Sequence, residues 1–214
     1  MNRKSVFVFT LLFAFAVVLS YAASIFPVLP LDIKSYYELQ EEASPFFDRS
    51  MQGVSYLGET SIALALTIIA VMTFALRHQW IEAIFMFATI SNVLVTFALK
   101  ELIHRARPFP MPIDSNGFLQ EINKYSFPSG HVLFFVVFFG LFAYLAWLNF
   151  SGHTRILVIL ACAVLIILIG LSRVFLGAHW ASDVLGGYVI GTIWLLILIF
   201  SYRWAIRRKA HDAS

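Results

Sequence analysis

Long uninterrupted runs of apolar residues alternate with short polar segments along the whole chain. Six runs approach the length of roughly 20 residues that a helix needs to cross a bilayer: residues 5–26, 61–76, 81–99, 132–150, 156–171 and 184–202. The second and fifth runs are short, and we expect their helices to extend past these limits. Because the runs are continuous rather than alternating, they do not fit the strands of a membrane barrel. The pattern predicts an all-α fold, a bundle of six transmembrane helices in one domain spanning residues 1–214.

The composition supports a protein that lives in the bilayer. Of 214 residues, 60% are hydrophobic and 13% are charged, whereas soluble domains carry about 25% charged residues. The formal net charge of +3 is too small to suggest a nucleic-acid partner. The single cysteine, Cys162, lies inside an apolar run, so we expect no intrachain disulfide and no thiol metal site.

The first apolar run has two interpretations. Arg3 and Lys4 precede it, and Ser20-Tyr21-Ala22 resembles a signal-peptidase site. The apolar character continues to Val28, which favours a retained helix.

The distribution of basic residues predicts the orientation. Lysine and arginine are enriched on the cytoplasmic side of membrane proteins. With six spans, both termini and the turns after the second and fourth runs fall on one side, which carries Arg3, Lys4, Arg77, Arg155, Arg203, Arg207, Arg208 and Lys209. We therefore expect both termini in the cytoplasm of a cell-membrane protein. Trp194 falls near the middle of the membrane, where its N–H needs a partner or a cavity.

Three segments then face the outer side: residues 31–59, 100–127 and 172–183. The first mixes acidic and aromatic residues in a pattern typical of a short helix lying in the interface. It is either a lid or lipid guide or a solvated connector, and the connector is favoured. The other two segments hold most of the remaining ionisable residues, as a shared active site requires.

The segment that follows the third run is cationic on the side where cations are not expected. Lys100 and Arg107 are seven residues apart, so they converge if the helix continues that far, and Pro108 then ends it. An anionic ligand would offset these charges. For Arg105 alone, a lipid-headgroup anchor is the favoured interpretation.

The two other segments bring a helix start and a histidine–carboxylate pair. Ser129 and Gly130 open the fourth run, where free N–H groups at a helix start bind phosphate, with the His131 imidazole alongside. His179 and Asp183 are four residues apart, on one face of any helix that begins there. Such a carboxylate fixes the imidazole tautomer and leaves the other nitrogen free to attack.

Together these groups favour phosphoryl transfer. The cations Lys100, Arg107 and Arg173 neutralise phosphate oxygens, one neutral histidine attacks phosphorus, and a second, protonated histidine supplies a proton to the leaving oxygen. A metal site fits poorly, because ligands other than Asp183 and the histidines are lacking and the cations would repel a divalent ion.

Three motifs carry a resemblance to a known family. Lys100 to Pro108 matches K-x6-R-P, Pro128 to His131 matches P-S-G-H, and Ser172 to Asp183 matches S-R-x5-H-x3-D. In this order and between these spans they resemble the type-2 phosphatidic acid phosphatase (PAP2) superfamily, in its integral-membrane lipid phosphatase branch.

The resemblance implies a function and a role for each site residue. His179 would form a phosphohistidine, Asp183 would orient it, and His131 would be the general acid. The phosphate would be held by Lys100, Arg107, Ser129, Gly130 and Arg173. The family works without a metal or other cofactor and removes phosphate from lipids at the outer face of the membrane. Its substrates include phosphatidic acid, phosphatidylglycerol phosphate, undecaprenyl diphosphate and lipid A phosphates.

Other functions remain open from the sequence. A phosphotransferase would use the same phosphohistidine with a different acceptor, and a lipid or anion transporter would use the cations for binding only. We expect headgroup choice to depend on residues 31–59 and 108–127. The sequence leaves the preferred lipid and the oligomeric state open.

Overall fold

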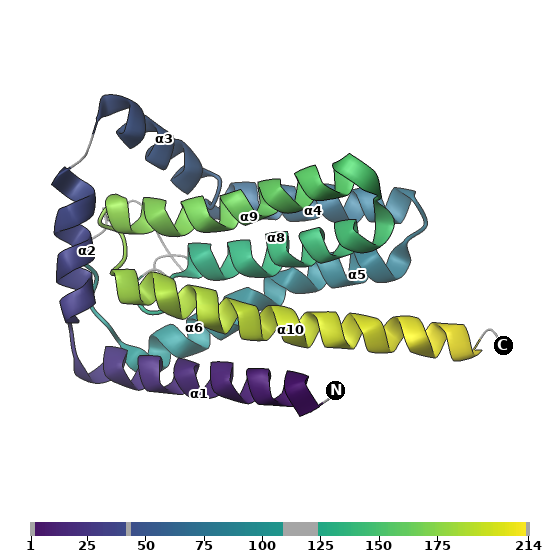
Figure 1. Ribbon diagram of the computed structural model, residues 1–214, viewed down its shortest axis with the longest axis horizontal. Helices are drawn as coiled ribbons and strands as arrows, with labels where there is room; N and C mark the ends of the chain where they lie inside the picture. The colour runs from purple at the N-terminus through teal and green to yellow at the C-terminus, as the bar shows by residue number, and fades with distance from the viewer. Residues whose placement is uncertain (1–2, 42–43, 109–123, 213–214) are drawn as a thin grey trace.

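The fold of the described residues is entirely helical (Figure 1). The computed structural model describes residues 3–41, 44–108 and 124–212. In chain order the elements are α1 (Arg3–Ile25), α2 (Pro30–Glu41), α3 (Pro45–Tyr56), α4 (Thr60–Leu76), α5 (Trp80–Ala88), a 3₁₀ turn (Thr89–Ser91), α6 (Asn92–Ile103), α8 (Gly130–Asn149), α9 (Gly152–Phe175) and α10 (Ala181–Asp212).

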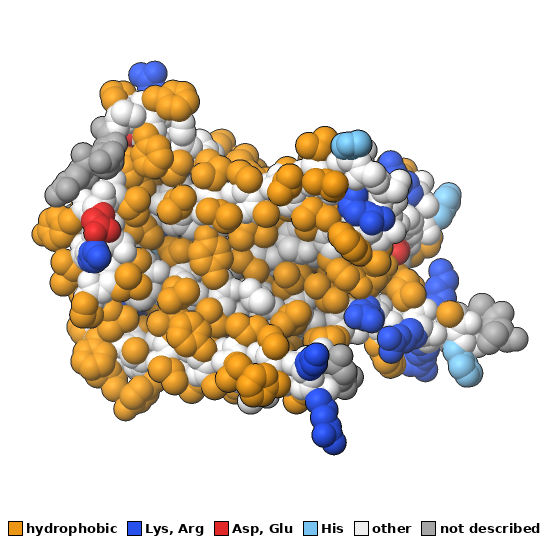
Figure 2. Space-filling model, viewed as in Figure 1, with side chains coloured by type: hydrophobic (Ala, Val, Ile, Leu, Met, Phe, Trp, Pro, Cys, Tyr) orange, Lys and Arg blue, Asp and Glu red, His pale blue; other side chains and the backbone are white. Residues whose placement is uncertain are grey.

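Five described helices are long and apolar enough to cross a membrane. They are α1, the continuous stretch Trp80–Ile103, α8, α9 and α10. The pair α3 and α4, bent by 59° at a short break, gives a sixth crossing if it is counted as one span. The lateral surface seen in Figure 2 is largely hydrophobic, as contact with lipid tails requires. On this count the predicted six-span helical bundle is confirmed.

Several helices extend beyond the apolar runs that predicted them. Lys100 lies within α6, Arg173 lies within the last turns of α9, and Asp183 lies in the first turn of α10. The predicted outer segments 100–127 and 172–183 are therefore partly helical. The extension of the fifth run was expected and is confirmed by α9, and the third and sixth runs extend in the same way.

The first outer segment contains two helices instead of the one that was expected. Ser44 caps α3, because its Oγ accepts a hydrogen bond from the Phe47 N–H at 3.3 Å. The Asp32 carboxylate accepts from the Leu29 N–H at 2.9 Å at the start of α2. Asp32 is fully buried, so the interpretation of this segment as a solvated connector is wrong at that position.

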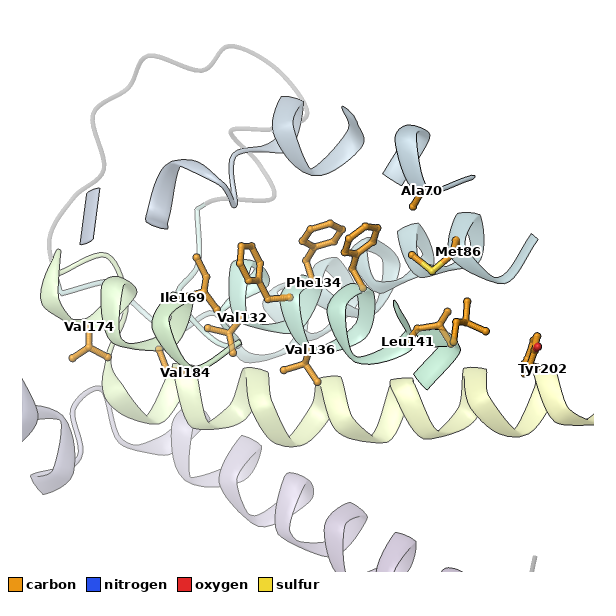
Figure 3. Packing of buried hydrophobic residues seen from close by; sticks show 13 residues of the cluster. Ala70, Met86, Val132, Phe134, Val136, Leu141, Ile169, Val174, Val184 and Tyr202 are labelled. Atoms are coloured by element: carbon orange, nitrogen blue, oxygen red, sulfur yellow. The ribbon is translucent and has the colours of Figure 1, made fainter. Parts of the chain in front are cut away.

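Helix α8 forms the centre of the bundle and packs along α9 and α10. All seven residues from Val132 to Phe138 are buried, which is the pattern of a helix surrounded on every side. Figure 3 shows Val136 pointing toward α10, near the start of which Val184 is buried in the same cluster. Near mid-membrane, the Trp194 indole N–H donates to Ser91 Oγ at 2.9 Å, so the predicted need for a partner is met.

The two ends of the bundle differ in charge and in structure. Lysine, arginine and histidine side chains gather at the end where α10 finishes (Figure 2). The opposite end holds α2 and the turn that joins α9 to α10 (Figure 1). The three motif segments meet at this second end, which therefore contains the candidate site.

Candidate active site

A cavity of about 620 Å³ opens among α4, α6, α8 and the turn after α9. Residues of all three motif segments line it: Lys100, Gly130, His131, Arg173, Ala178 and His179. Its remaining wall is mostly apolar and includes Leu64, Ile90, Val93 and Phe134. The cavity is thus cationic at one end, and along the other its apolar side chains alternate with polar ones such as Thr67, Asn92 and Thr96, which fits a phosphate group attached to a lipid.

His179 lies on a tight turn between α9 and α10. Gly177 has a φ of 65°, a conformation that glycine adopts without strain. The His179 N–H donates to the Arg173 carbonyl at 3.1 Å, and the His179 side chain is almost fully buried. The turn therefore fixes the imidazole against the cavity.

One nitrogen of His179 faces an acidic partner. His179 Nδ1 lies 3.7 Å from Asp183 Oδ2, although α10 begins only at Ala181, after the histidine. The proximity that was predicted from a shared helical face comes from the turn instead. Asp183 Oδ2 also accepts a hydrogen bond from the Trp180 N–H at 2.9 Å, which fixes the carboxylate.

Ser126 is a site residue that sequence reasoning missed. Its Oγ donates to Asp183 Oδ2 and lies 3.4 Å from His179 Nδ1, so it bridges the two groups. Ser126 stands two residues before the P-S-G-H motif, and its backbone N–H donates to the Arg105 carbonyl at 2.8 Å. A serine in a loop gives no signal of this role until the loop is placed against α10.

The other nitrogen of His179 faces a cation. Arg107 Nη1 lies 3.5 Å from His179 Nε2 and donates to the Ala178 carbonyl at 2.9 Å. Helix α6 ends at Ile103, and His104 turns the chain with a φ of 53°. Lys100 and Arg107 therefore do not converge through a continuous helix as predicted. The turn at His104 returns Arg107 to the site instead.

The start of α8 carries unpaired polar atoms. Ser129 occupies the N-cap position, but its side chain makes no capping hydrogen bond. Its backbone N–H donates to the Asp183 carbonyl at 3.1 Å. Among the described residues, Ser129 Oγ, His131 Nε2 and Arg173 Nε are buried without a hydrogen-bond partner. Buried polar atoms are rarely left unpaired, so these three mark where a polar ligand fits.

Glycine brings the neighbouring chain against His131. A Cβ atom added to Gly58 would lie 2.2 Å from His131 Cδ2. The break between α3 and α4 therefore packs directly on the imidazole ring. The same region supplies Ser55, whose Oγ accepts a hydrogen bond from Arg173 Nη1.

Arg105 is buried at the centre of an ion-pair network, and its interpretation as a lipid-headgroup anchor is wrong. Its Nη1 donates to Asp183 Oδ1 at 2.6 Å and to Ser182 Oγ at 2.7 Å, and its Nη2 donates to Asp32 Oδ2 at 2.7 Å. Asp32 Oδ1 accepts from the Ser182 N–H at 2.8 Å. One guanidinium therefore joins α2 to the carboxylate beside His179. The charge faces inward because two buried carboxylates stabilise it better than lipid headgroups would.

Burial and neighbouring cations set the ionisation of the groups outside the spans. Burial, followed by the charges of Arg107, Arg173 and Lys100, lowers the pKa of His179 well below its usual value of 6.5. Burial also lowers the pKa of Arg107 to about 10, although the Asp183 carboxylate opposes this shift. The imidazole is thus neutral and the guanidinium charged near pH 7, the states that attack on an anionic phosphate requires.

Comparison with known proteins identifies relatives of the chain. The family model described as "PAP2 superfamily" matches residues 81–208. The chain is 32% identical to phosphatidylglycerophosphatase B of Bacillus subtilis over 77% of this chain and 79% of the relative. It is 34% identical to a lipid A 1-phosphatase of Rhizobium johnstonii, over 58% of this chain and 48% of that one.

A solved structure is also similar. The crystal structure of a transmembrane PAP2-type phosphatidylglycerolphosphate phosphatase from Bacillus subtilis matches with a TM-score of 0.74 and 28% identity. The match covers 89% of this chain and 93% of that one.

Proposed function

The chain belongs to the PAP2 superfamily of membrane lipid phosphatases, and from that premise we propose that it hydrolyses a lipid phosphate through a phosphohistidine on His179. The observation that carries the proposal is that Lys100, His131 and His179, from three separate segments, line one cavity. The apolar part of the cavity wall accommodates the tail of a lipid.

The first half of the reaction transfers the phosphoryl group to the enzyme. Lys100, Arg107 and Arg173 hold the phosphate oxygens, and the N–H groups at the start of α8 add further donors. His179 attacks phosphorus through Nε2, the nitrogen beside Arg107, while Asp183 stabilises the opposite N–H. The bond from phosphorus to the lipid oxygen breaks, and that oxygen takes a proton from His131.

The second half restores the enzyme. Water attacks the phosphorus of phosphohistidine, and His131 accepts the proton that water releases. The phosphorus–nitrogen bond breaks, inorganic phosphate leaves, and His179 returns to its neutral form. The products are therefore the dephosphorylated lipid and one phosphate per turnover, with no metal required at any step.

We propose a glycerophospholipid monoester of the phosphatidylglycerol phosphate or phosphatidic acid type as substrate, with polyprenyl diphosphates as the second class. The similarity to phosphatidylglycerophosphatase B supports the first class. The site lies at the end of the bundle opposite the basic cluster. Because basic residues favour the cytoplasmic side, we place the site at the outer face and both termini inside.

A phosphate-release assay with a matched histidine control tests the mechanism. His179→Ala is expected to lower kcat by at least about 10³-fold on phosphatidylglycerol phosphate and phosphatidic acid. His153→Ala is the control, because His153 is exposed at the far end of α9, roughly 30 Å from Arg173 along the helix. It is expected to retain wild-type activity.

Trapping the intermediate tests the chemistry separately. With substrate labelled in the phosphate, wild-type protein quenched in base is expected to carry label on histidine, and His179→Ala protein none. Full activity of His179→Ala would overturn the mechanism. Labelled protein together with phosphorylated acceptor and no inorganic phosphate would identify a transferase instead.

A further inference from the structure

Helix α6 presents a line of buried polar residues to the cavity. Asn92, Thr96 and Lys100 follow one another at intervals of four, which places them on one face, and all three line the cavity. This face lies within the span Trp80–Ile103, where polar side chains are costly and usually functional. The mechanism uses only Lys100, so the polar residues deeper in the membrane need a different explanation.

Thr96 is unusual among the threonines of these helices. In a helix interior a threonine hydroxyl commonly donates to the carbonyl four residues earlier. Thr67, Thr73 and Thr192 do so at 2.7–2.8 Å. Thr96 Oγ1, in a residue only 4% exposed, is buried with no hydrogen-bond partner in the part of the chain that the structure describes. It is therefore a buried donor without a partner in a residue that lines the cavity.

The position of Thr96 relates this donor to the phosphate. A helix rises 1.5 Å per residue, so Thr96 lies about 6 Å deeper in the membrane than Lys100. The Thr96 methyl group lies beside the α8 start, 3.2 Å from where a Gly130 Cβ would be. A lipid whose phosphate is held at Lys100 and Gly130 must pass Thr96 with the part of the molecule that directly follows its headgroup.

That part differs between the two candidate substrate classes. In a glycerophospholipid, ester carbonyl oxygens follow the phosphate after one glycerol unit, and they accept hydrogen bonds. In a polyprenyl diphosphate the second phosphate follows at once and hydrocarbon comes after it, so no ester carbonyl is present at the depth of Thr96. A site that offers a hydrogen-bond donor disfavours an analogue that lacks the acceptor.

We propose that Thr96 donates a hydrogen bond to an ester carbonyl of a glycerophospholipid and so favours this class over polyprenyl diphosphates. The assignment rests on the proposed phosphatase function and adds a specificity-determining residue to it. Asn92, one turn deeper, continues the polar face toward the membrane interior. The Asn92 amide already donates to the Thr89 carbonyl at 2.5 Å, so Thr96 is the residue of this face at the depth of the glycerol region.

The test combines an isosteric variant with matched substrates. Thr96→Val keeps the shape that packs against Gly130 and removes only the hydroxyl. We measure kcat/KM in detergent micelles for diacyl phosphatidic acid, its dialkyl-ether analogue without carbonyls, and farnesyl diphosphate. Thr96→Val is expected to lower kcat/KM about 5–10-fold on the diacyl substrate alone, the usual effect of one lost hydrogen bond. Wild-type protein is expected to prefer diacyl over diether substrate by the same factor.

Two further variants make the result specific. Thr96→Ser keeps the hydroxyl and is expected to restore most of the diacyl preference. Thr73→Val removes a threonine hydroxyl that bonds within α4 and is exposed, and it is expected to leave all three rates unchanged.

The outcomes separate this inference from the proposed function. Three results would overturn the role of Thr96 while leaving the phosphatase function intact. They are an equal loss of kcat/KM on all three substrates in Thr96→Val, no loss on the diacyl substrate, and equal kcat/KM of the wild-type enzyme on diacyl and diether lipids. The wild-type comparison decides the question even if Thr96→Val fails to fold. Phosphate release from no lipid would overturn both.

Discussion

Replacement of Arg105 by methionine is expected to destabilise the protein strongly. The guanidinium has no exposed surface and pairs with Asp32 and Asp183 at 2.6–2.7 Å. Methionine has a similar length but leaves both carboxylates buried without a counter-charge. Breaking a buried pair by removing one partner costs about 3–5 kcal/mol, and the upper part of that range applies because two carboxylates lose their partner. For a chain of this size a loss of about 4–5 kcal/mol corresponds to a fall in Tm of roughly 8–20 °C.

The measurement is thermal unfolding in one fixed detergent, followed by tryptophan fluorescence. Arg49→Met is the matched control, because Arg49 is an exposed arginine on α3, and exposed substitutions usually change the free energy of unfolding by less than about 0.5 kcal/mol. Arg105→Lys keeps the charge but cannot donate to both carboxylates in the same fork geometry, so an intermediate loss is expected. A Tm for Arg105→Met within about 2 °C of the Arg49→Met value would refute the reasoning.

A double substitution isolates the coupling between α2 and the active site. Asp32→Asn removes one of the two carboxylates, so Arg105→Met is expected to cost less in the Asp32→Asn background than in the wild type. The difference is the interaction free energy of the pair, which for residues in one network is typically about 0.5–3 kcal/mol. Strictly additive effects would show that Asp32 and Arg105 are independent.

Five further predictions concern the site. The pKa of His179 is lowered from 6.5, so its contribution to stability is complete above about pH 6.5 and is lost as pH falls toward the folded-state pKa. For the same reason, the acid limb of kcat/KM that His179 sets is expected below pH 6.5. Arg107→Gln removes a cation beside His179, so that limb should move to higher pH; an unmoved limb in a pH–rate series would contradict this electrostatic explanation. Ser126→Ala is expected to lower kcat about 10-fold with little change in KM, and equal changes in both in steady-state kinetics would count against a positioning role. Gly58→Ala should lower kcat even at temperatures where the variant stays folded, because its methyl group displaces His131. EDTA should leave phosphate release unchanged, and strict dependence on added divalent ions would contradict this expectation.

The features that could be predicted from the sequence are those written as local patterns. Apolar runs of near-membrane length gave the spans, since burial in lipid requires them wherever they occur. The three motif segments were expected to meet because they alternate with spans and so share one side of the bilayer. Lys100, His131 and His179 do line one cavity. Their catalytic roles stay predictions.

The features that could not be predicted depend on contacts between distant segments. Arg105 and Asp32 are 73 residues apart, and an arginine at a span end has the same local sequence whether it faces lipid headgroups or a carboxylate. Asp32 belongs to an amphipathic segment whose composition is equally typical of a solvated connector. Ser126 likewise gains its partners only when its loop is packed against α10. Each of these residues was misjudged or missed because its environment is set by tertiary packing.

Hydrogen bonding divides the buried polar groups at this end of the bundle into two kinds. The charges of Asp32, Arg105 and Asp183 are paired with one another, so that network is complete without a substrate and its expected effect is on stability and positioning. In contrast, four atoms of the site, Thr96 Oγ1, Ser129 Oγ, His131 Nε2 and Arg173 Nε, are buried without partners in the described chain, as is Glu101 Oε1, whose residue does not line the cavity. Such atoms are tolerated where a ligand supplies the missing bonds, because an unpaired buried polar atom otherwise costs about 1–3 kcal/mol. Three of the four site atoms belong to the motifs that bind phosphate in the proposed mechanism, and the fourth, Thr96, extends the same logic to the part of the lipid that follows.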